Sequence, residues 1–312
     1  MRASRLQFVL AILWVAATAH TADNADEHFL RGNDLAKQQN WDAAIAEYRE
    51  VVRLRPAYTE AHYNLGNAFW GKGDLQGAVH AYQEAIRLNP DFVRAHNNLA
   101  LVLRARGDLE GAVREFQEAV RRKPDYAEAH FNLGNVLADQ REYDAATTQY
   151  REAIRLKPDS PSLHNNLALA LKAKGDSDGA LTEYVEAIRL RPDYAEAHYN
   201  LGNALADKRD LEGALAEYRL ALLLKPDDAA AQNNLGLIFA QKGDLNRAIF
   251  EYRWAIRLQP KNAKAQHNLG RALEQRGDLK AALQQYAAAC QMDAKNPDYR
   301  ADYSRLSQTL GR

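Results

Sequence analysis

The sequence predicts an all-α fold, a solenoid of repeated helix pairs, and three periodic columns of residues support this prediction. Prolines recur every 34 residues from Pro56 to Pro260. Counted from residue 25, the same step places alanine at position 20 and an aromatic residue at position 24 of every repeat, as in Ala78 and Tyr82. A fixed period of about 20 to 50 residues is the signature of repeat architectures. Residues 25–296 therefore divide into eight repeats, which begin at residues 25, 59, 93, 127, 161, 195, 229 and 263.

Each repeat is predicted to contain two helices, and the second repeat illustrates why. Its positions 4, 7, 8 and 11 follow the i, i+3, i+4, i+7 spacing of one helical face. Gly73 suits the left-handed residue that ends a helix, and Asp74 suits the N-cap of the next helix. Apolar residues at alternating steps of three and four then run from Leu75 to Leu88. Pro90 ends the second helix, because the residue before a proline avoids the helical region.

The spacing of these small, aromatic and proline residues resembles the signature of the tetratricopeptide repeat. The resemblance covers residues 25–296, nearly the whole chain, although histidine mostly stands where that signature has tryptophan. It implies a right-handed superhelical solenoid of antiparallel helix pairs that binds other proteins. The repeats are also similar to the repeat region of O-GlcNAc transferase, where an asparagine ladder on the inner surface grips a peptide backbone. No glycosyltransferase domain follows here, so only the binding part of that resemblance is expected to apply.

The N-terminus departs from the repeat pattern. Arg2 and Arg5 precede an apolar run of about 12 residues, and the small residues 17–19 follow it, which is the order of a secretory signal peptide. The run is shorter than the roughly 20 residues of a membrane helix. We therefore expect residues 1–19 to be cleaved and 20–24 to be a short linker, with an uncleaved anchor as the alternative. The mature protein would be exported, periplasmic or secreted, without a stable membrane span.

The C-terminus is predicted to cover the last repeat, as the ends of a solenoid require. Residues 297–312 begin with a proline, which suits the first turn of a helix. One face of that helix would carry Tyr299, Tyr303, Leu306 and Leu310. We expect these side chains to pack on the eighth repeat as a capping helix.

Composition and motifs argue against several classes of function. The chain has 41 basic and 41 acidic side chains, which gives no reason to expect nucleic acid as a partner. The motifs of phosphate-binding loops, hydrolase nucleophiles and zinc sites are absent from the sequence. We therefore expect no enzymatic activity, no cofactor and no metal. A histidine column at position 4 (His62, His96, His130, His164 and His198) occupies the large packing position of the signature, so we interpret it as packing.

The candidate binding residues are asparagines at position 6 of the repeats. This column comprises Asn64, Asn98, Asn132, Asn166, Asn200, Asn234 and Asn268. It lies off the buried stripe of the first helix, and its amides offer both donors and an acceptor to a peptide backbone. Every second repeat adds further candidates, namely Asn67, Asn135 and Asn203 together with Tyr63, Phe131 and Tyr199, so the copied module is 68 residues. The alternative is an inherited consensus residue that bonds locally.

These observations predict a non-enzymatic scaffold that holds an extended or helical segment of another protein in a concave groove. The lysine that a carboxylate clamp needs is missing at position 5, so we do not expect that activity. The alternative function is an accessory subunit of an envelope, pilus or polysaccharide secretion complex. Such a subunit would use the outer face or the ends of the solenoid.

Overall fold

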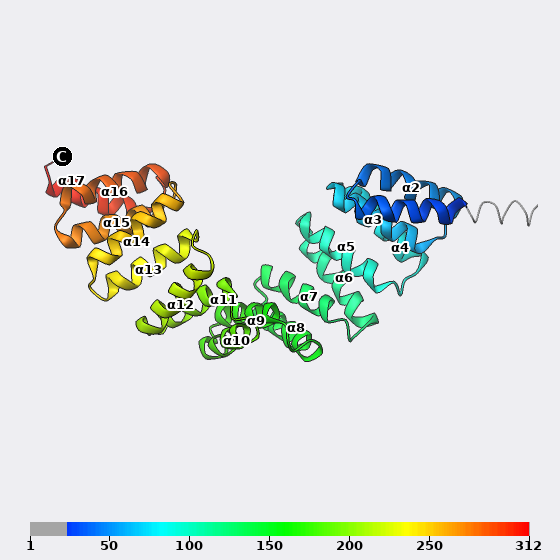
Figure 1. Cartoon of the computed structure of the whole chain (residues 1–312), viewed down its shortest axis with the longest axis horizontal. Coiled ribbons are helices and arrows are strands. Elements are labelled where there is room, and N and C mark those ends of the chain that lie inside the picture. The colour runs from blue at the N-terminus through cyan, green and yellow to red at the C-terminus, as the bar shows by residue number, and fades with distance from the viewer. Residues whose placement is uncertain (1–23, 312) are drawn as a thin grey trace, which may run out of the picture. The chain divides into compact units, whose positions relative to one another are not determined.

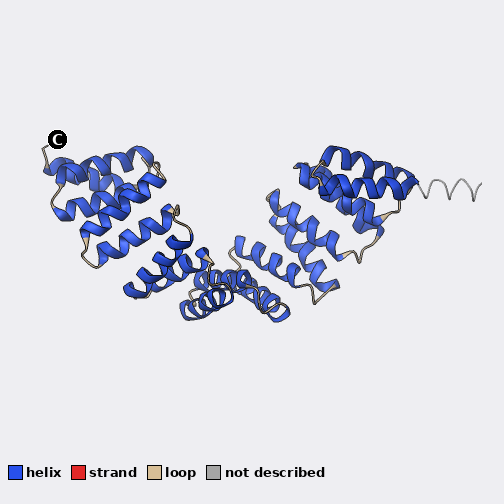
Figure 2. Cartoon of the chain, viewed as in Figure 1, coloured by secondary structure: helices blue, strands red, loops and turns tan. Residues whose placement is uncertain are grey.

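The structure is a computed structural model, and it describes residues 24–311. Within that range the regular structure is entirely helical, as Figure 2 shows. The predicted signal peptide lies outside the described residues, as does most of the predicted linker, and a helix already begins at residue 24. The chain separates into two compact parts at Pro158. We call them the N-terminal half and the C-terminal half and describe each by itself.

The N-terminal half consists of four helix pairs, which follow one another in chain order (Figure 1). The pairs are residues 24–37 with α2 (Trp41–Leu54), α3 (Thr59–Lys72) with α4 (Leu75–Leu88), α5 (Val93–Ala105) with α6 (Leu109–Arg122), and α7 (Ala127–Asp139) with α8 (Tyr143–Leu156). The second helix of one pair also contacts the first helix of the next, as α4 contacts α5. This chain of neighbour contacts is what a solenoid requires.

The C-terminal half repeats the same arrangement and adds one helix. Its pairs are α9 (Pro161–Lys174) with α10 (Ser177–Leu190), α11 (Ala195–Asp207) with α12 (Leu211–Leu224), α13 (Ala229–Gln241) with α14 (Leu245–Leu258), and α15 (Ala263–Arg276) with α16 (Leu279–Met292). The last helix is α17 (Pro297–Thr309), which packs against α16. Together the two halves confirm the predicted all-α helical-repeat solenoid.

The turns inside the helix pairs form as their residues predict. Gly73 ends α3 in the left-handed conformation, with a φ of 86°. Asp74 then caps α4, because its side chain accepts a hydrogen bond from the backbone N–H of Gly77 at 2.9 Å. One glycine and one aspartate therefore stop one helix and start the next within two residues.

The core of each repeat is built on the aromatic residue at position 24. Tyr82 is fully buried, and a Cβ on Gly66 at position 8 would lie only 2.6 Å from its ring. The small residue at position 8 thus lets the tyrosine of the second helix lie directly on the backbone of the first helix. Burying an aromatic ring of this size is a large apolar contribution to stability.

Helix α17 covers the end of the eighth repeat with part of the predicted face. Leu306 is fully buried in the core that it shares with α16, and Leu310 packs beside it. Tyr299 stacks on His267 at 4.7 Å between ring centroids. Tyr303, which was predicted to pack on the eighth repeat, is 37% exposed. Asp302 faces α15 instead, where its carboxylate lies 2.9 Å from Nε2 of His267.

Candidate functional site

The histidine column at position 4 lies inside the helix pairs. His96 is 4% exposed, and its Nδ1 lies 2.7 Å from a carboxylate oxygen of Glu115. Its Nε2 lies 2.9 Å from the carbonyl oxygen of Pro90, the proline that ends the previous repeat. His198 makes the same two contacts, with Glu217 and Pro192. These histidines fasten the first helix to the second helix and to the preceding repeat, which agrees with a packing role.

Within the described residues, six of the seven asparagines at position 6, all except Asn166, form hydrogen bonds to the preceding repeat. In the first pattern, Asn98 Nδ2 donates to Oδ1 of Asn67, at position 9 of the preceding repeat, at 3.0 Å. The same oxygen accepts a 2.6 Å hydrogen bond from the hydroxyl of the buried Tyr82. Two further sets of residues repeat this pattern, namely Asn64 with Asn33 and Tyr48, and Asn234 with Asn203 and Tyr218. The amide thus ties one repeat to the tyrosine of the previous repeat.

A second pattern occurs in the fourth, sixth and eighth repeats, whereas the first occurs in the second, third and seventh. In the second pattern, the Nδ2 at position 6 donates to the Oδ1 of the asparagine at position 5 of the preceding repeat. The pairs are Asn132 with Asn97 at 3.1 Å, Asn200 with Asn165 at 3.2 Å, and Asn268 with Asn233 at 3.0 Å. The pattern depends on whether the preceding repeat carries asparagine at position 9 or at position 5, and this difference underlies the 68-residue alternation in the sequence. Contact of this column with a peptide stays a prediction.

The aromatic candidates at position 5 are half-buried and pack against the core. The ring centroids of Tyr63 and Tyr82 are 5.8 Å apart, those of Phe131 and Tyr150 are 6.1 Å apart, and those of Tyr199 and Tyr218 are 6.0 Å apart. Each therefore presents only part of its ring to solvent. Their contribution to a binding surface is an apolar edge beside the amides.

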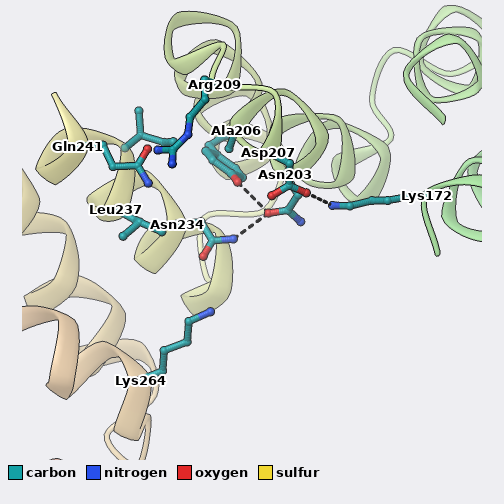
Figure 3. Close-up of a pocket in the computed structure, with 11 residues that line it drawn as sticks. Lys172, Asn203, Ala206, Asp207, Arg209, Asn234, Leu237, Gln241 and Lys264 are labelled. Atoms are coloured by element: carbon teal, nitrogen blue, oxygen red, sulfur yellow. Dashed lines mark hydrogen bonds and ion pairs between the residues drawn. The ribbon is translucent and has the colours of Figure 1, made fainter. Parts of the chain in front are cut away.

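A groove of about 420 Å³ opens in the C-terminal half on the side of the first helices (Figure 3). Its lining residues include Lys172 of α9, Asn203 and Asp207 of α11, Asn234 and Gln241 of α13, and Lys264 of α15. Figure 3 shows Lys264 reaching from α15 with its amino group toward Asn234. A neighbouring hollow of about 240 Å³ shares Gln241 with the groove and adds Asn268 and Arg271.

The groove carries an excess of positive charge. Lys172 is paired with Asp207 at 2.8 Å, so these two charges offset one another. Lys264 and Arg209, which also lines the groove, form no ion pair with any residue from 24 to 311. Both are exposed. An anionic or carbonyl-rich ligand would therefore find donors here that no carboxylate of the described chain occupies.

Arg209 is held in a conformation that side chains rarely adopt. Its φ is 65°, in the left-handed region, at the position where five other repeats have glycine, as in Gly175 and Gly243. The left-handed region costs a non-glycine residue about 1–2 kcal/mol. Strain of this kind is common at functional sites, although Arg141 and Gln39 share the conformation at the same position of other repeats.

The polar lining is held in place by the buried tyrosine beneath it. Burial raises the pKa of Tyr218 far above its usual range, so the phenol stays a neutral donor to Asn203 at 2.7 Å. Asn203 thereby accepts from Tyr218 and from Asn234, as the dashed lines in Figure 3 show. Its own Nδ2 makes no hydrogen bond within the described part of the chain and is available to a ligand.

Models of the repeat family match most of the chain. The model described as tetratricopeptide repeat matches residues 29–91, 65–126, 97–161 and 234–297, and a second repeat model matches residues 169–208 and 202–243. The chain belongs to the tetratricopeptide repeat family. No curated protein matches this tetratricopeptide repeat chain significantly.

Solved structures of other tetratricopeptide repeat proteins share the fold. The crystal structure of YrrB, described as a protein of this family with an unusual peptide-binding site, is 26% identical with a TM-score of 0.52, and the match covers 61% of this chain and 98% of YrrB. PilF of Pseudomonas aeruginosa is 21% identical with a TM-score of 0.59, covering 67% of this chain and 95% of that one. The C-terminal part of a repeat protein from Cytophaga hutchinsonii is 16% identical with a TM-score of 0.64, covering 77% and 99%.

The groove contains some of the predicted residues and adds others. Asn203 and Asn234 line it, whereas Asn200 bonds Asn165 of the preceding repeat and is absent from the lining. Sequence reasoning missed Arg209, although an arginine at a glycine position was a usable signal. Among residues 24–311, no three His, Cys, Asp or Glu side chains are arranged to hold a metal ion. None of the helices there combines the length and hydropathy needed to cross a bilayer.

Proposed function

We propose that this tetratricopeptide repeat protein is a non-enzymatic scaffold that binds an extended segment of another protein along the first helices of its repeats. The observation that carries the proposal is the groove of the C-terminal half, which combines amide donors with cations that lack an ion pair. An extended backbone offers many carbonyl oxygens, which the amides of Asn203 and Gln241 and the amino group of Lys264 can bond. The 26% identity with YrrB, described as having a peptide-binding site, supports this function.

Peptide selection on the intact protein tests the proposal. A phage-displayed library of random peptides is selected on the wild type, and the peptides are then titrated against a groove variant that carries Arg209→Gly, Gln241→Ala and Lys264→Ala. None of these side chains forms a helix–helix contact of the core, so we expect unchanged helicity by circular dichroism. Loss of three donors should weaken binding at least about tenfold.

A matched control keeps the comparison specific. The changes Lys280→Ala and Gln308→Ala remove an amine and an amide from exposed sites outside the groove. We expect this variant to bind the selected peptides like the wild type. Peptides that bind the groove variant with wild-type affinity would rule out the groove as the binding site.

We also propose that the protein is exported and that residues 1–19 are removed. The basic start, the short apolar run and the small residues before the cleavage point support this proposal. Intact-mass measurement on fractions of cells that express the full chain tests it. A chain that begins at His20 outside the cytoplasm is the expected result, and a full-length chain confined to the cytoplasm would contradict it.

The alternative function, an accessory subunit of an envelope, pilus or polysaccharide secretion complex, would use surfaces outside the groove. Large apolar side chains are exposed on α12 and α14, and they support a binding surface outside the groove. If the groove variant keeps every partner that the wild type has in the native host, the accessory role is the better description.

A further inference from the structure

The outward side of the second helices follows a strict pattern in the first five repeats. Glutamate at position 26 and arginine at position 29 form an i, i+3 ion pair, with distances from 2.5 to 2.9 Å. The pairs are Glu50–Arg53, Glu84–Arg87, Glu118–Arg121, Glu152–Arg155 and Glu186–Arg189. Such pairs add little stability, but they keep this side of the helices polar.

The sixth and seventh repeats replace this polar surface with large apolar side chains. In α12 the glutamate and the arginine become Leu220 and Leu223, which are 41% and 75% exposed. In α14 the glutamate becomes Trp254, which is 41% exposed. Position 22 of the same repeat holds Phe250, which is 62% exposed. We call these four residues the α12–α14 patch.

The patch lies on one side of two neighbouring second helices. Positions 22, 26 and 29 are spaced by four and three residues, so they share one helical face. Leu220 and Trp254 occupy the same position in adjacent repeats of the C-terminal half. Each large apolar side chain left in water forgoes about 25 cal/mol per Å² of the stabilisation that burial would give. Several large apolar side chains exposed on the same side of consecutive repeats indicate an interaction site.

The rim of the patch is cationic. Along α14, Arg247 and Arg257 bracket Phe250 and Trp254 on the same helical face, at positions 19 and 29. Arg257 lies over the ring of Trp254 at 5.5 Å. Arg219 of α12 and Arg253 of α14 are exposed nearby. Arg247 contacts Asp244 at 3.4 Å, and both Arg247 and Arg219 lie over the ring of Phe239, at 5.6 and 5.9 Å from its centroid.

Two of the three carboxylates of these two helices are directed away from the arginine rim. Glu212 bonds Lys242, Glu217 bonds His198, and Glu251 bonds Gln232. Glu212 and Glu217 are therefore directed to partners other than the four arginines, whereas Glu251 also interacts with the charge of Arg219. The patch therefore combines exposed apolar side chains with arginines on the same two helices, and aromatic residues and arginine are enriched at protein interfaces.

We propose that the α12–α14 patch docks an acidic amphipathic helix of a partner protein, with apolar side chains on one face and aspartate or glutamate flanking them. The apolar face would cover Leu223, Phe250 and Trp254, and the acidic flanks would meet the arginines. A second copy of this chain is disfavoured as occupant of its own patch, because the two arginine rims would repel each other. The proposal concerns a surface separate from the peptide groove and does not depend on it.

A variant built from the chain's own repeats tests the proposal. The changes Leu220→Glu, Leu223→Arg, Phe250→Thr and Trp254→Glu install the residues that the fourth repeat carries at the same positions, Glu152, Arg155 and Thr148. The solenoid already accommodates them, so we expect an unchanged circular dichroism spectrum and melting temperature. The probe is a fluorescently labelled synthetic helix with leucine and phenylalanine on one face and glutamate on the other.

We expect the probe to bind the wild type and to bind the fourfold variant at least about tenfold more weakly. A version of the probe with lysine in place of glutamate should also bind at least about tenfold more weakly, and added salt should weaken binding of the acidic probe. Equal binding to wild type and variant would overturn the proposal.

Two other outcomes would assign the patch to a different occupant and so overturn the proposal as well. One is a wild-type dimer in light scattering that becomes a monomer in the fourfold variant. The other is sedimentation of the wild type, but not the variant, with vesicles of phosphatidylcholine and phosphatidylglycerol. The groove variant described above should bind the acidic probe like the wild type, which separates failure of this proposal from failure of the groove.

Discussion

The tyrosine at position 24 needs a hydrogen-bond acceptor when it is buried, and the repeats differ in whether they supply one. Asparagine at position 9 accepts from Tyr48, Tyr82, Tyr150 and Tyr218. In the fifth repeat position 9 is Leu169, and the buried hydroxyl of Tyr184 makes no hydrogen bond with any residue of the described chain. The third repeat has leucine at position 9 too, but there the aromatic residue is Phe116, which has no hydroxyl to satisfy.

The difference between Tyr218 and Tyr184 gives a prediction at the residue scale. Tyr218→Phe removes a 2.7 Å hydrogen bond and should lower the free energy of unfolding by about 1 kcal/mol. Tyr184→Phe removes an unsatisfied buried hydroxyl and should raise the free energy of unfolding by about 1 kcal/mol. Urea unfolding followed by circular dichroism measures both, and each variant serves as the control for the other because the ring stays in place. Equal destabilisation by the two changes would show that the hydrogen bond to Asn203 contributes nothing.

This pair of residues also shows what the sequence could and could not predict. Burial of the aromatic column follows from its period and from the small residue at position 8. The hydrogen-bond partner of each hydroxyl cannot be predicted from the period, because it lies on another helix. Asn203, for example, is 15 residues from Tyr218. The same limit applies to the position-6 asparagines. Their positions were evident, but their bonds to the preceding repeat depend on the distance between neighbouring first helices.

At the scale of the helices, starts and stops were the most predictable feature. Gly73 and Asp74 act as their residue types indicate, because capping is local in sequence. The helix at residues 297–309 and its apolar stripe were also evident from the sequence, but its rotation was not. The rotation is fixed by polar contacts with α15, where Asp302 bonds His267 and Arg305 bonds Glu274.

The contact of α17 with Glu274 predicts an acid-sensitive end of the solenoid. Arg305 donates two hydrogen bonds to Glu274, at 2.6 and 2.9 Å, and these bonds hold the pKa of that carboxyl below its usual range. Near pH 4 the unfolded chain therefore binds this proton more readily than the folded chain. The contact contributes its full stabilisation above about pH 4.3 and loses it as the pH falls through the pKa of the folded state. We expect protection of the α17 amides from hydrogen exchange to decrease between pH 5 and pH 3, after correction for intrinsic exchange.

The variant Glu274→Gln provides the control for this prediction. It keeps the shape of the side chain but removes the titrating group, so α17 should be less protected at pH 5 and should change little on acidification. A loss of protection in the variant that equals the loss in the wild type would show that the acid effect does not come from Glu274.

At the scale of the whole molecule, repetition made the fold predictable and made the binding surfaces harder to recognise. Eight copies in phase gave the fold class, because every column supported the same period. Both binding surfaces that we propose include departures from the average repeat, such as Arg209 at a glycine position or Trp254 at a glutamate position. Most of the consensus asparagines at position 6 instead donate hydrogen bonds from their amide nitrogens to the preceding repeat. We therefore expect single-repeat differences, together with free amides such as that of Asn203, to mark the surfaces that bind a partner.

The buried tyrosine column predicts that the solenoid unfolds in alkali. Burial raises the pKa of Tyr48 to about 12 and that of the column's other tyrosines further. Above pH 10 the unfolded chain has released these protons while the folded chain keeps them, so the free energy of unfolding falls as the pH rises. Each phenol contributes a slope of up to about 1.4 kcal/mol per pH unit. We expect phenolate absorbance and loss of helicity to rise together above pH 10. The free energy of unfolding should fall less steeply with pH in Tyr218→Phe than in the wild type. Phenols that ionise while the helices stay intact would contradict this prediction, because solvent would then reach the tyrosine column in the folded state.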